Sequence, residues 1–237
     1  MKVSVNNFST INFKSRNNPV TPFVINTQKG NLFVKEFREA DAKSQKQSEK
    51  LAKFFVDGFI SNTKDPWFLS LKDKNNKNKY KDAIKHFAKY YSSMFEKDDG
   101  NLTILVACNE KNKLCGAVVT NTLNEAGVVD SQTCYVDSIA VSPQYRKQGI
   151  GKLLMEKAIS CSKDIYTDSF LASDNMAVAF QERNGYKALD YSNPLERKII
   201  DKINATRGDY PEYITFMHKK LKNNSKDNTW ANRIKID

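Results

Sequence analysis

Two spacings of hydrophobic residues alternate along the chain and predict strands and helices in turn. Residues 32–38 switch partly between apolar and polar positions, which is typical of a strand with one buried face. In residues 51–59, and again in 84–95, apolar side chains recur every three to four positions, the spacing of a helix with one apolar stripe. The first part of the body therefore predicts a strand followed by two helices.

The middle of the chain favours β structure. Residues 103–108 and 114–120 are apolar runs joined by a polar segment, 109–113, a pattern typical of a β-hairpin. A further strand is expected over 133–141. After it, the pattern predicts helices over 150–161, 177–183 and 194–203 and strands over 165–171, 186–190 and 213–218. This order is typical of a mixed α+β sheet with helices on its faces.

The two ends of the chain lack this periodicity. Residues 1–30 are rich in Asn, Ser, Thr and Lys, so we expect a flexible N-terminal arm. Residues 222–237 have a similar composition and are expected to form a polar C-terminal tail, which Trp230 and Ile234 are candidates to anchor. One folded domain is then expected over residues 31–221, a length that suits a single core.

The net charge of +11 arises mostly in three polar stretches. Residues 1–30 carry four basic and no acidic side chains, 222–237 carry four against two, and 72–86 carry six lysines against two aspartates. Only +1 remains for the rest of the chain. The charge therefore marks no single recognition helix, and a nucleic-acid-binding module acting through the basic ends is the weaker alternative.

The sequence argues against several other classes of protein. Its longest apolar stretches, such as 102–108, are too short to cross a bilayer, and the first residues contain no apolar block of a secretory signal. We therefore expect a cytoplasmic protein without a membrane segment. The four cysteines form no C-x-x-C pair and the two histidines are distant in sequence, so reduced thiols and no metal are expected. His86 and His218 are expected to be structural.

Chemically informative residues gather between the strand ending at 141 and the helix beginning at 150. Gly149 and Gly151 allow a tight turn and close approach of the backbone to a ligand, and the first N–H groups of a helix lack intrahelical partners. Arg146, Lys147 and Lys152 add positive charge to the helix dipole, so the turn is expected to hold a diphosphate. Its spacing matches neither a dinucleotide fingerprint nor a P-loop.

This turn resembles the pyrophosphate loop of the GNAT superfamily of N-acetyltransferases, R/Q-x-x-G-x-G/A, with Arg146, Gly149 and Gly151 at the defining positions. The resemblance covers roughly residues 31–221. It implies the GNAT fold, a mixed and mostly antiparallel sheet of six to seven strands with helices on both faces and one splayed parallel strand pair. It also implies acetyl-CoA as the donor, direct attack by an amine of a small molecule or peptide, and a monomer or homodimer.

A second segment, residues 174–186, is similar to the family pattern N-x-x-A-x-x-x-Y-x-x-x-G-F, with Ala177 and Gly185 in their expected places. It departs from the pattern at Asp174, where the family usually has Asn, and at Gln181, where it usually has Tyr. The family's Tyr commonly protonates the leaving thiolate, and glutamine has no titratable proton for that role. An acyl-CoA-binding sensor without efficient transfer is therefore a second hypothesis.

The resemblance also implies roles for individual residues. The expected acetyl-CoA-binding residues are Ile139, Ala140, Val141, Arg146, Lys147, Gln148, Gly149, Ile150, Gly151, Lys152, Asn175 and Gln181. Trp67 and Phe68 lie where the family builds its acceptor pocket.

Candidate catalytic residues follow from the same comparison. An amine of pKa near 10.4 must lose a proton before it attacks, and Asp137 is the candidate base, acting through water. Simple alternation would place Tyr135, Asp137, Ile139 and Val141 on one side of the strand. Tyr135 and Tyr186 are the candidate acids, with water as the alternative.

Overall fold

The computed structural model describes residues 5–7, 20–61, 63–73, 77–96, 101–161, 166–207, 214–221 and 230–236. The strands are β1 (Val5–Asn7), β2 (Phe23–Thr27), β3 (Gly30–Glu36), β4 (Thr103–Asn109), β5 (Leu114–Glu125), β6 (Val128–Val141), β7 (Asp168–Asp174), β8 (Lys187–Ala188), β9 (Ile214–Lys220) and β10 (Lys235–Ile236). The helices are α1 (Glu39–Lys43), α2 (Gln45–Ile60), α3 (Pro66–Ser70), α4 (Lys77–Glu96), the 3₁₀ turn η1 (Pro143–Tyr145), α5 (Ile150–Cys161), α6 (Val178–Arg183), α7 (Pro194–Arg207) and α8 (Trp230–Arg233).

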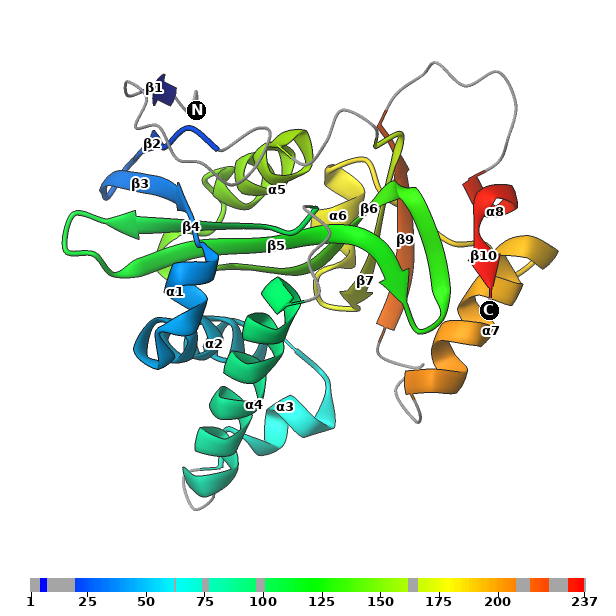
Figure 1. The fold of residues 1–237 in the computed structure, drawn as a ribbon, viewed down its shortest axis with the longest axis horizontal. Helices are drawn as coiled ribbons and strands as arrows, with labels where there is room; N and C mark the ends of the chain where they lie inside the picture. Colours follow the sequence, from blue (N-terminus) through cyan, green and yellow to red (C-terminus); the bar gives the residue numbers. More distant parts are fainter. Residues whose placement is uncertain are drawn as a thin grey trace.

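The strands form one sheet in the order β1-β2-β3-β4-β5-β6-β7-β9-β8, and β10 pairs with β6 (Figure 1). Among the described strands all neighbours are antiparallel except β6 and β7, which are parallel. The predicted mixed and mostly antiparallel α+β sheet is therefore confirmed. It is larger than the six to seven strands expected, because both ends of the chain add strands.

Helices cover both faces of the central strands (Figure 1). On one face, α5 buries Ile150, Leu154 and Ala158, at successive four-residue intervals, against β4 and β5. On the other face, α2 and α4 bury Leu51 and Tyr91 in a second cluster. None of the described helices is long and apolar enough to cross a membrane.

The boundary expected at residue 30 is wrong, because part of the expected arm is a strand of the sheet. Phe23–Thr27 pairs with residues 30–34, and Val20 and Phe23 are buried in the core. Residues 1–4 and 8–19 of that arm lie outside the described residues. The expected C-terminal tail is described only from Trp230, which is buried beside β6 and β7.

A β-bulge interrupts β6 at Asp137. Val119 pairs with Ser138 and Thr120 with Val136, so β6 has one residue more than β5 at this point. The alternation expected along β6 is therefore wrong. Tyr135 packs in the cluster of Trp230, whereas Ile139 packs with the cluster under α5.

The parallel pair β6 and β7 separates just beyond this bulge. Pairing between the two strands runs only from Thr133 with Asp168 to Val136 with Leu171. The rest of β6 and the end of β7 then diverge, which is the splayed pair that the sequence resemblance implies. This divergence opens the sheet at the centre of the molecule.

Asp168 joins the C-terminal segment to the sheet. Its carboxylate accepts hydrogen bonds from His218 Nε2 at 2.7 Å, Arg233 Nη2 at 2.7 Å and Thr167 Oγ1 at 2.5 Å. Burial by itself would raise the pKa of Asp168, but the hydrogen bonds from these three residues outweigh it and lower the pKa to about 2. The ionised carboxylate is therefore part of the folded state.

This pKa predicts a loss of stability in acid. A carboxyl group with a lowered folded-state pKa stabilises the fold above its unfolded pKa, near 3.8, and this contribution disappears as the pH falls through about 2. We expect the free energy of unfolding, measured by urea titration, to fall by about 2 kcal/mol from this source between pH 5 and 2. In Asp168→Asn this part of the pH dependence disappears, whereas exposed Asp190→Asn retains it. Parallel pH curves for wild type and Asp168→Asn would contradict the assignment.

Candidate active site

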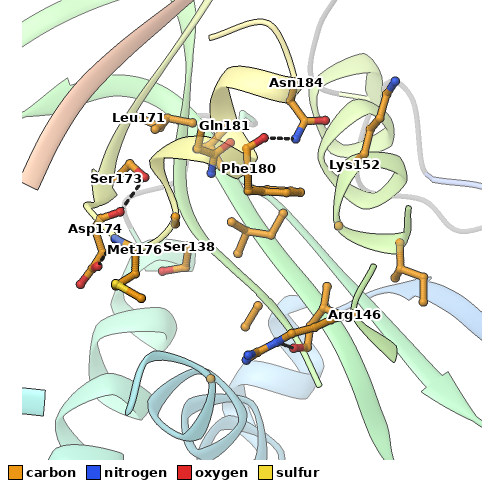
Figure 2. Close-up of a pocket in the computed structure, with 18 of the residues that line it drawn as sticks. Ser138, Arg146, Lys152, Leu171, Ser173, Asp174, Met176, Phe180, Gln181 and Asn184 are labelled. Carbon is orange, nitrogen blue, oxygen red and sulfur yellow. Dashed lines mark hydrogen bonds between the residues drawn. The ribbon is translucent and has the colours of Figure 1, made fainter. Parts of the chain in front are cut away.

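A cavity of about 980 Å³ occupies the opening between β6 and β7. Its walls come from residues 136–141 of β6, 171–174 of β7, the turn before α5 and the helix α6. Gly58 and Phe59 of α2 close another side. Figure 2 shows Asp174, Met176 and Ser138 on the left of these walls, Lys152 at the upper right and Arg146 at the lower edge.

The glycine turn forms the first end of the cavity. Gly149 has φ of +79° and Lys147 has φ of +60°, both in the left-handed region, and α5 begins directly after them. A Cβ atom on Gly151 would lie 3.2 Å from Cζ of Phe180 and would narrow the space beside the helix N-terminus. The turn therefore leaves room for an anion beside the N–H groups of the first helical turn.

The basic side chains around this turn differ in their roles. Arg146 donates from Nε to the carbonyl oxygen of Val141 at 2.9 Å and from Nη2 to Oγ of Ser61 at 2.7 Å, so it joins the end of β6 to the end of α2. Lys147, Lys152 and Arg183 line the cavity without being buried, and supply positive charge to the same end.

Most of the expected donor-binding residues lie on the cavity wall. Ile139, Ala140 and Val141 line it along the stretch of β6 that β7 no longer covers. Two expected residues are not part of this wall. Gln148 Oε1 accepts from the backbone N of Gln28 at 3.3 Å, and Asn175 Oδ1 accepts from Thr215 at 2.9 Å.

The second end of the cavity is acidic. Asp137 lies at the bulge and lines the cavity half-buried, with Tyr90 of α4 donating to its Oδ2 at 2.5 Å and Ser138 donating to its Oδ1 at 2.7 Å. Asp174 lines the same region and accepts from Thr63 Oγ1 at 2.5 Å. The cavity therefore has positive charge at the glycine turn and negative charge at the opposite end.

The two expected acids lie away from the cavity wall. The Tyr135 ring is buried and stacks on Phe170 at a centroid distance of 6.0 Å. The Tyr186 hydroxyl is hydrogen-bonded to Ser169 Oγ at 2.7 Å, and burial raises the pKa of Tyr186 well above its usual value. Neither residue is among those that line the cavity.

Gln181, by contrast, lies on the wall as the motif implies. It is 3% exposed, and its Oε1 is buried without a hydrogen-bond partner among the described residues. A buried amide oxygen without a partner is costly, which is typical of a group that functions with a bound molecule. Figure 2 shows the Gln181 side chain on α6, beside Leu171.

Trp67 and Phe68 lie one layer behind the cavity rather than on its wall. Phe68 packs against Phe59 at a centroid distance of 5.3 Å, and Trp67 packs against Phe68 at 4.9 Å. Phe59 is the aromatic residue that reaches the wall. Helical spacing placed Phe59 on an apolar stripe but held no signal that this position faces a cavity.

Tyr90 is the other residue that sequence patterns missed, because it lies beside Tyr91 in an ordinary amphipathic helix.

Across the part of the chain that the structure describes, no group of three or more His, Cys, Asp or Glu side chains is arranged to hold a metal ion.

Comparisons with known proteins found a family and several solved structures to which this chain is similar. The model of the Acetyltransferase (GNAT) family matches residues 67–186. Among solved structures, PaiA N-acetyltransferase from Thermoplasma acidophilum in complex with coenzyme A has a TM-score of 0.52 at 12% identity, covering 80% of this chain and 99% of that one. The GNAT domain of S. lividans PAT has a TM-score of 0.51 at 10% identity, covering 84% and 97%. A search of curated protein sequences finds no match.

Proposed function

Because the chain belongs to the GNAT acetyltransferase family, we propose that it transfers an acetyl group from acetyl-CoA to a primary amine of a small molecule or peptide. The observation that carries this proposal is the polarity of the cavity. The glycine turn with Arg146, Lys147 and Lys152 suits the phosphates of the donor, and Asp137 at the other end suits a protonated amine.

The donor end of the cavity fits coenzyme A. The PaiA N-acetyltransferase structure, which shares this fold, contains coenzyme A. In this chain, the N–H groups at the start of α5 would bind the diphosphate, and Gly149 and Gly151 leave it room. The uncovered backbone of Ile139 to Val141 would bind the pantetheine arm and donate to the thioester oxygen as negative charge develops there.

The acceptor end provides a route for the amine proton. A protonated amine entering beside Asp137 is attracted by the carboxylate, which takes the proton through a water molecule before the nitrogen attacks. Tyr135 and Tyr186 do not line the cavity, so water carries to the leaving thiolate the second proton, which the nitrogen loses as the C–S bond breaks and the amide forms. The side-chain amide of Gln181 would hydrogen-bond the bound donor, at the position where the family usually has a tyrosine that can give up a proton.

The proposed function is tested with acetyl-CoA and a panel of amines: 1,4-diaminobutane, lysine amide and a peptide with a free α-amine. Calorimetry should detect acetyl-CoA binding, and thiol release with mass spectrometry should detect acetylation of at least one amine. Gly151→Val, which fills the space beside Phe180, should weaken acetyl-CoA binding at least about tenfold. Ser160→Val, at an exposed position of the same helix outside the cavity, is the matched control.

Two outcomes would replace the proposal. Tight acetyl-CoA binding without turnover on any amine favours the sensor hypothesis that Gln181 suggests. No acetyl-CoA binding, together with strongly salt-dependent binding of nucleic acid that is abolished when the Lys and Arg side chains of both ends are replaced by Gln, favours the nucleic-acid-binding module.

A further inference from the structure

Two adjacent tyrosines of α4 are linked to the Asp137 carboxylate, Tyr90 directly and Tyr91 through Ser138. Tyr90 donates directly to Oδ2 at 2.5 Å. Ser138 donates to Oδ1 at 2.7 Å, and Tyr91 lies 3.0 Å from the Ser138 oxygen. Because a serine hydroxyl has one proton and Ser138 gives it to Asp137, Tyr91 is the donor in that second contact. Both carboxylate oxygens are therefore connected to α4.

The two tyrosines lie in different surroundings. Tyr91 is 1% exposed and is part of the core under α4, whereas Tyr90 is 39% exposed at the edge of the helix. A partly exposed tyrosine contributes little to the core, but its hydroxyl is turned toward a half-buried carboxylate that lines the cavity. The position of the Tyr90 side chain is therefore better explained by its hydrogen bond to Asp137 than by packing in the core.

We propose that Tyr90 is a positioning residue, which fixes the Asp137 carboxylate at the bulge and keeps it ionised for the incoming amine. The inference rests on the proposed function of Asp137. A hydrogen bond to the ionised form of an acid favours that form, so loss of the Tyr90 hydroxyl should raise the pKa of Asp137 and free its side chain to rotate.

Tyr90 remains a donor over the working range of pH. Burial, followed by the negative charge of Asp137, raises the pKa of Tyr90 far above its usual value. Among the described residues, the other ionisable groups that face this pair are Tyr91 on α4, Tyr135 on β6 and Glu125 on β5. Negative charge on Tyr135 or Glu125 raises the pKa of Tyr90, and the charge of Asp137 raises the pKa of Tyr91. Tyr90→Phe leaves the side chains of all these groups in place and removes one hydroxyl, with its hydrogen bond to Asp137.

The test compares Tyr90→Phe with Tyr80→Phe. Tyr80 lies on the same helix and also donates to an aspartate at 2.5 Å, but that aspartate is Asp57 on α2. The Asp137 carboxyl is titrated by NMR in protein with ¹³C-labelled aspartate carboxyls, and Asp137→Asn identifies its signal. We expect Tyr90→Phe to raise the midpoint by about one pH unit and Tyr80→Phe to leave it unchanged.

Activity provides the second measurement, on whichever amine of the panel is acetylated fastest. Tyr90→Phe should lower kcat about tenfold with unchanged acetyl-CoA affinity, and should have less than about a twofold effect in an Asp137→Asn background. An unchanged midpoint, or equal effects of Tyr90→Phe in both backgrounds, overturns the inference. Full activity of Asp137→Asn overturns the role of Asp137 as the base and leaves acetyl transfer established, and the NMR titration still decides whether Tyr90 controls the Asp137 carboxyl.

Discussion

Asp137→Asn is expected to lower turnover at least about 100-fold while the affinity for acetyl-CoA changes less than about twofold. Asparagine keeps the shape of the side chain and can still accept from Tyr90, so the fold around the bulge should persist. It cannot take up the amine proton or attract a protonated amine as a charge does. At the donor end of the cavity, Arg146 is held by Val141 and Ser61, whereas Asp137 is held by Tyr90 and Ser138.

The measurements are thiol release under saturating acetyl-CoA, calorimetry for donor affinity and thermal unfolding for the fold. Asp57→Asn is the matched control, because Asp57 also accepts from a tyrosine of α4 but lies outside the cavity. Wild-type turnover in Asp137→Asn would exclude Asp137 as the base. A parallel loss of turnover and of acetyl-CoA affinity would mean that the substitution disturbs the donor site.

Trp230→Ala is expected to lower the free energy of unfolding by about 3 to 5 kcal/mol, although the residue lies at the end of the chain. Its indole stacks on His218 at 4.4 Å and on Phe170 at 5.4 Å between ring centroids. Its Nε1 donates to Thr133 Oγ1 at 2.9 Å, at the start of the parallel pair β6 and β7. Truncation leaves a cavity between three elements that the C-terminal segment joins.

Urea unfolding at neutral pH measures this effect, with a decrease in Tm of about 10 °C as the companion result. Trp67→Ala is the control, since Trp67 is only half-buried beside α2 and α4, and it should cost distinctly less. A loss below about 1 kcal/mol for Trp230→Ala would show that the C-terminal segment contributes little to the folded state. Trp230 does not line the cavity, so acetyl-CoA binding below the transition should be unchanged.

Sequence patterns were most informative where a structure depends on neighbouring residues. The helix over 150–161 follows from an apolar stripe within twelve residues, and α5 has those bounds. The turn before it needs a residue that tolerates positive φ, and glycine provides this at Gly149. Both features are local, so the glycine turn and the family resemblance could be identified from the chain alone.

Patterns were less informative where two distant segments decide the outcome. The bulge at Asp137 depends on how β6 pairs with β5, and it reversed the expected faces of the strand. A strand of residues 23–27 was missed because its apolar side chains become buried only when β3 pairs beside them. Trp67 and Phe68 are aromatic residues of the kind that line pockets, but they lie behind Phe59. Phe59 lines the cavity instead, because α2 packs close to β6.

The sequence by itself determined the family, the order of the main elements and the cationic turn, because each depends on residues close together in the chain. Only the tertiary structure decided what surrounds the acidic end of the cavity, where Asp137 lies. Tyr90 and Asp137 are 47 positions apart, and nothing in either segment specifies the other. Their contact exists because α4 packs against α2, which in turn packs on β6, and the free energy for that arrangement comes from the whole buried interface rather than from either residue.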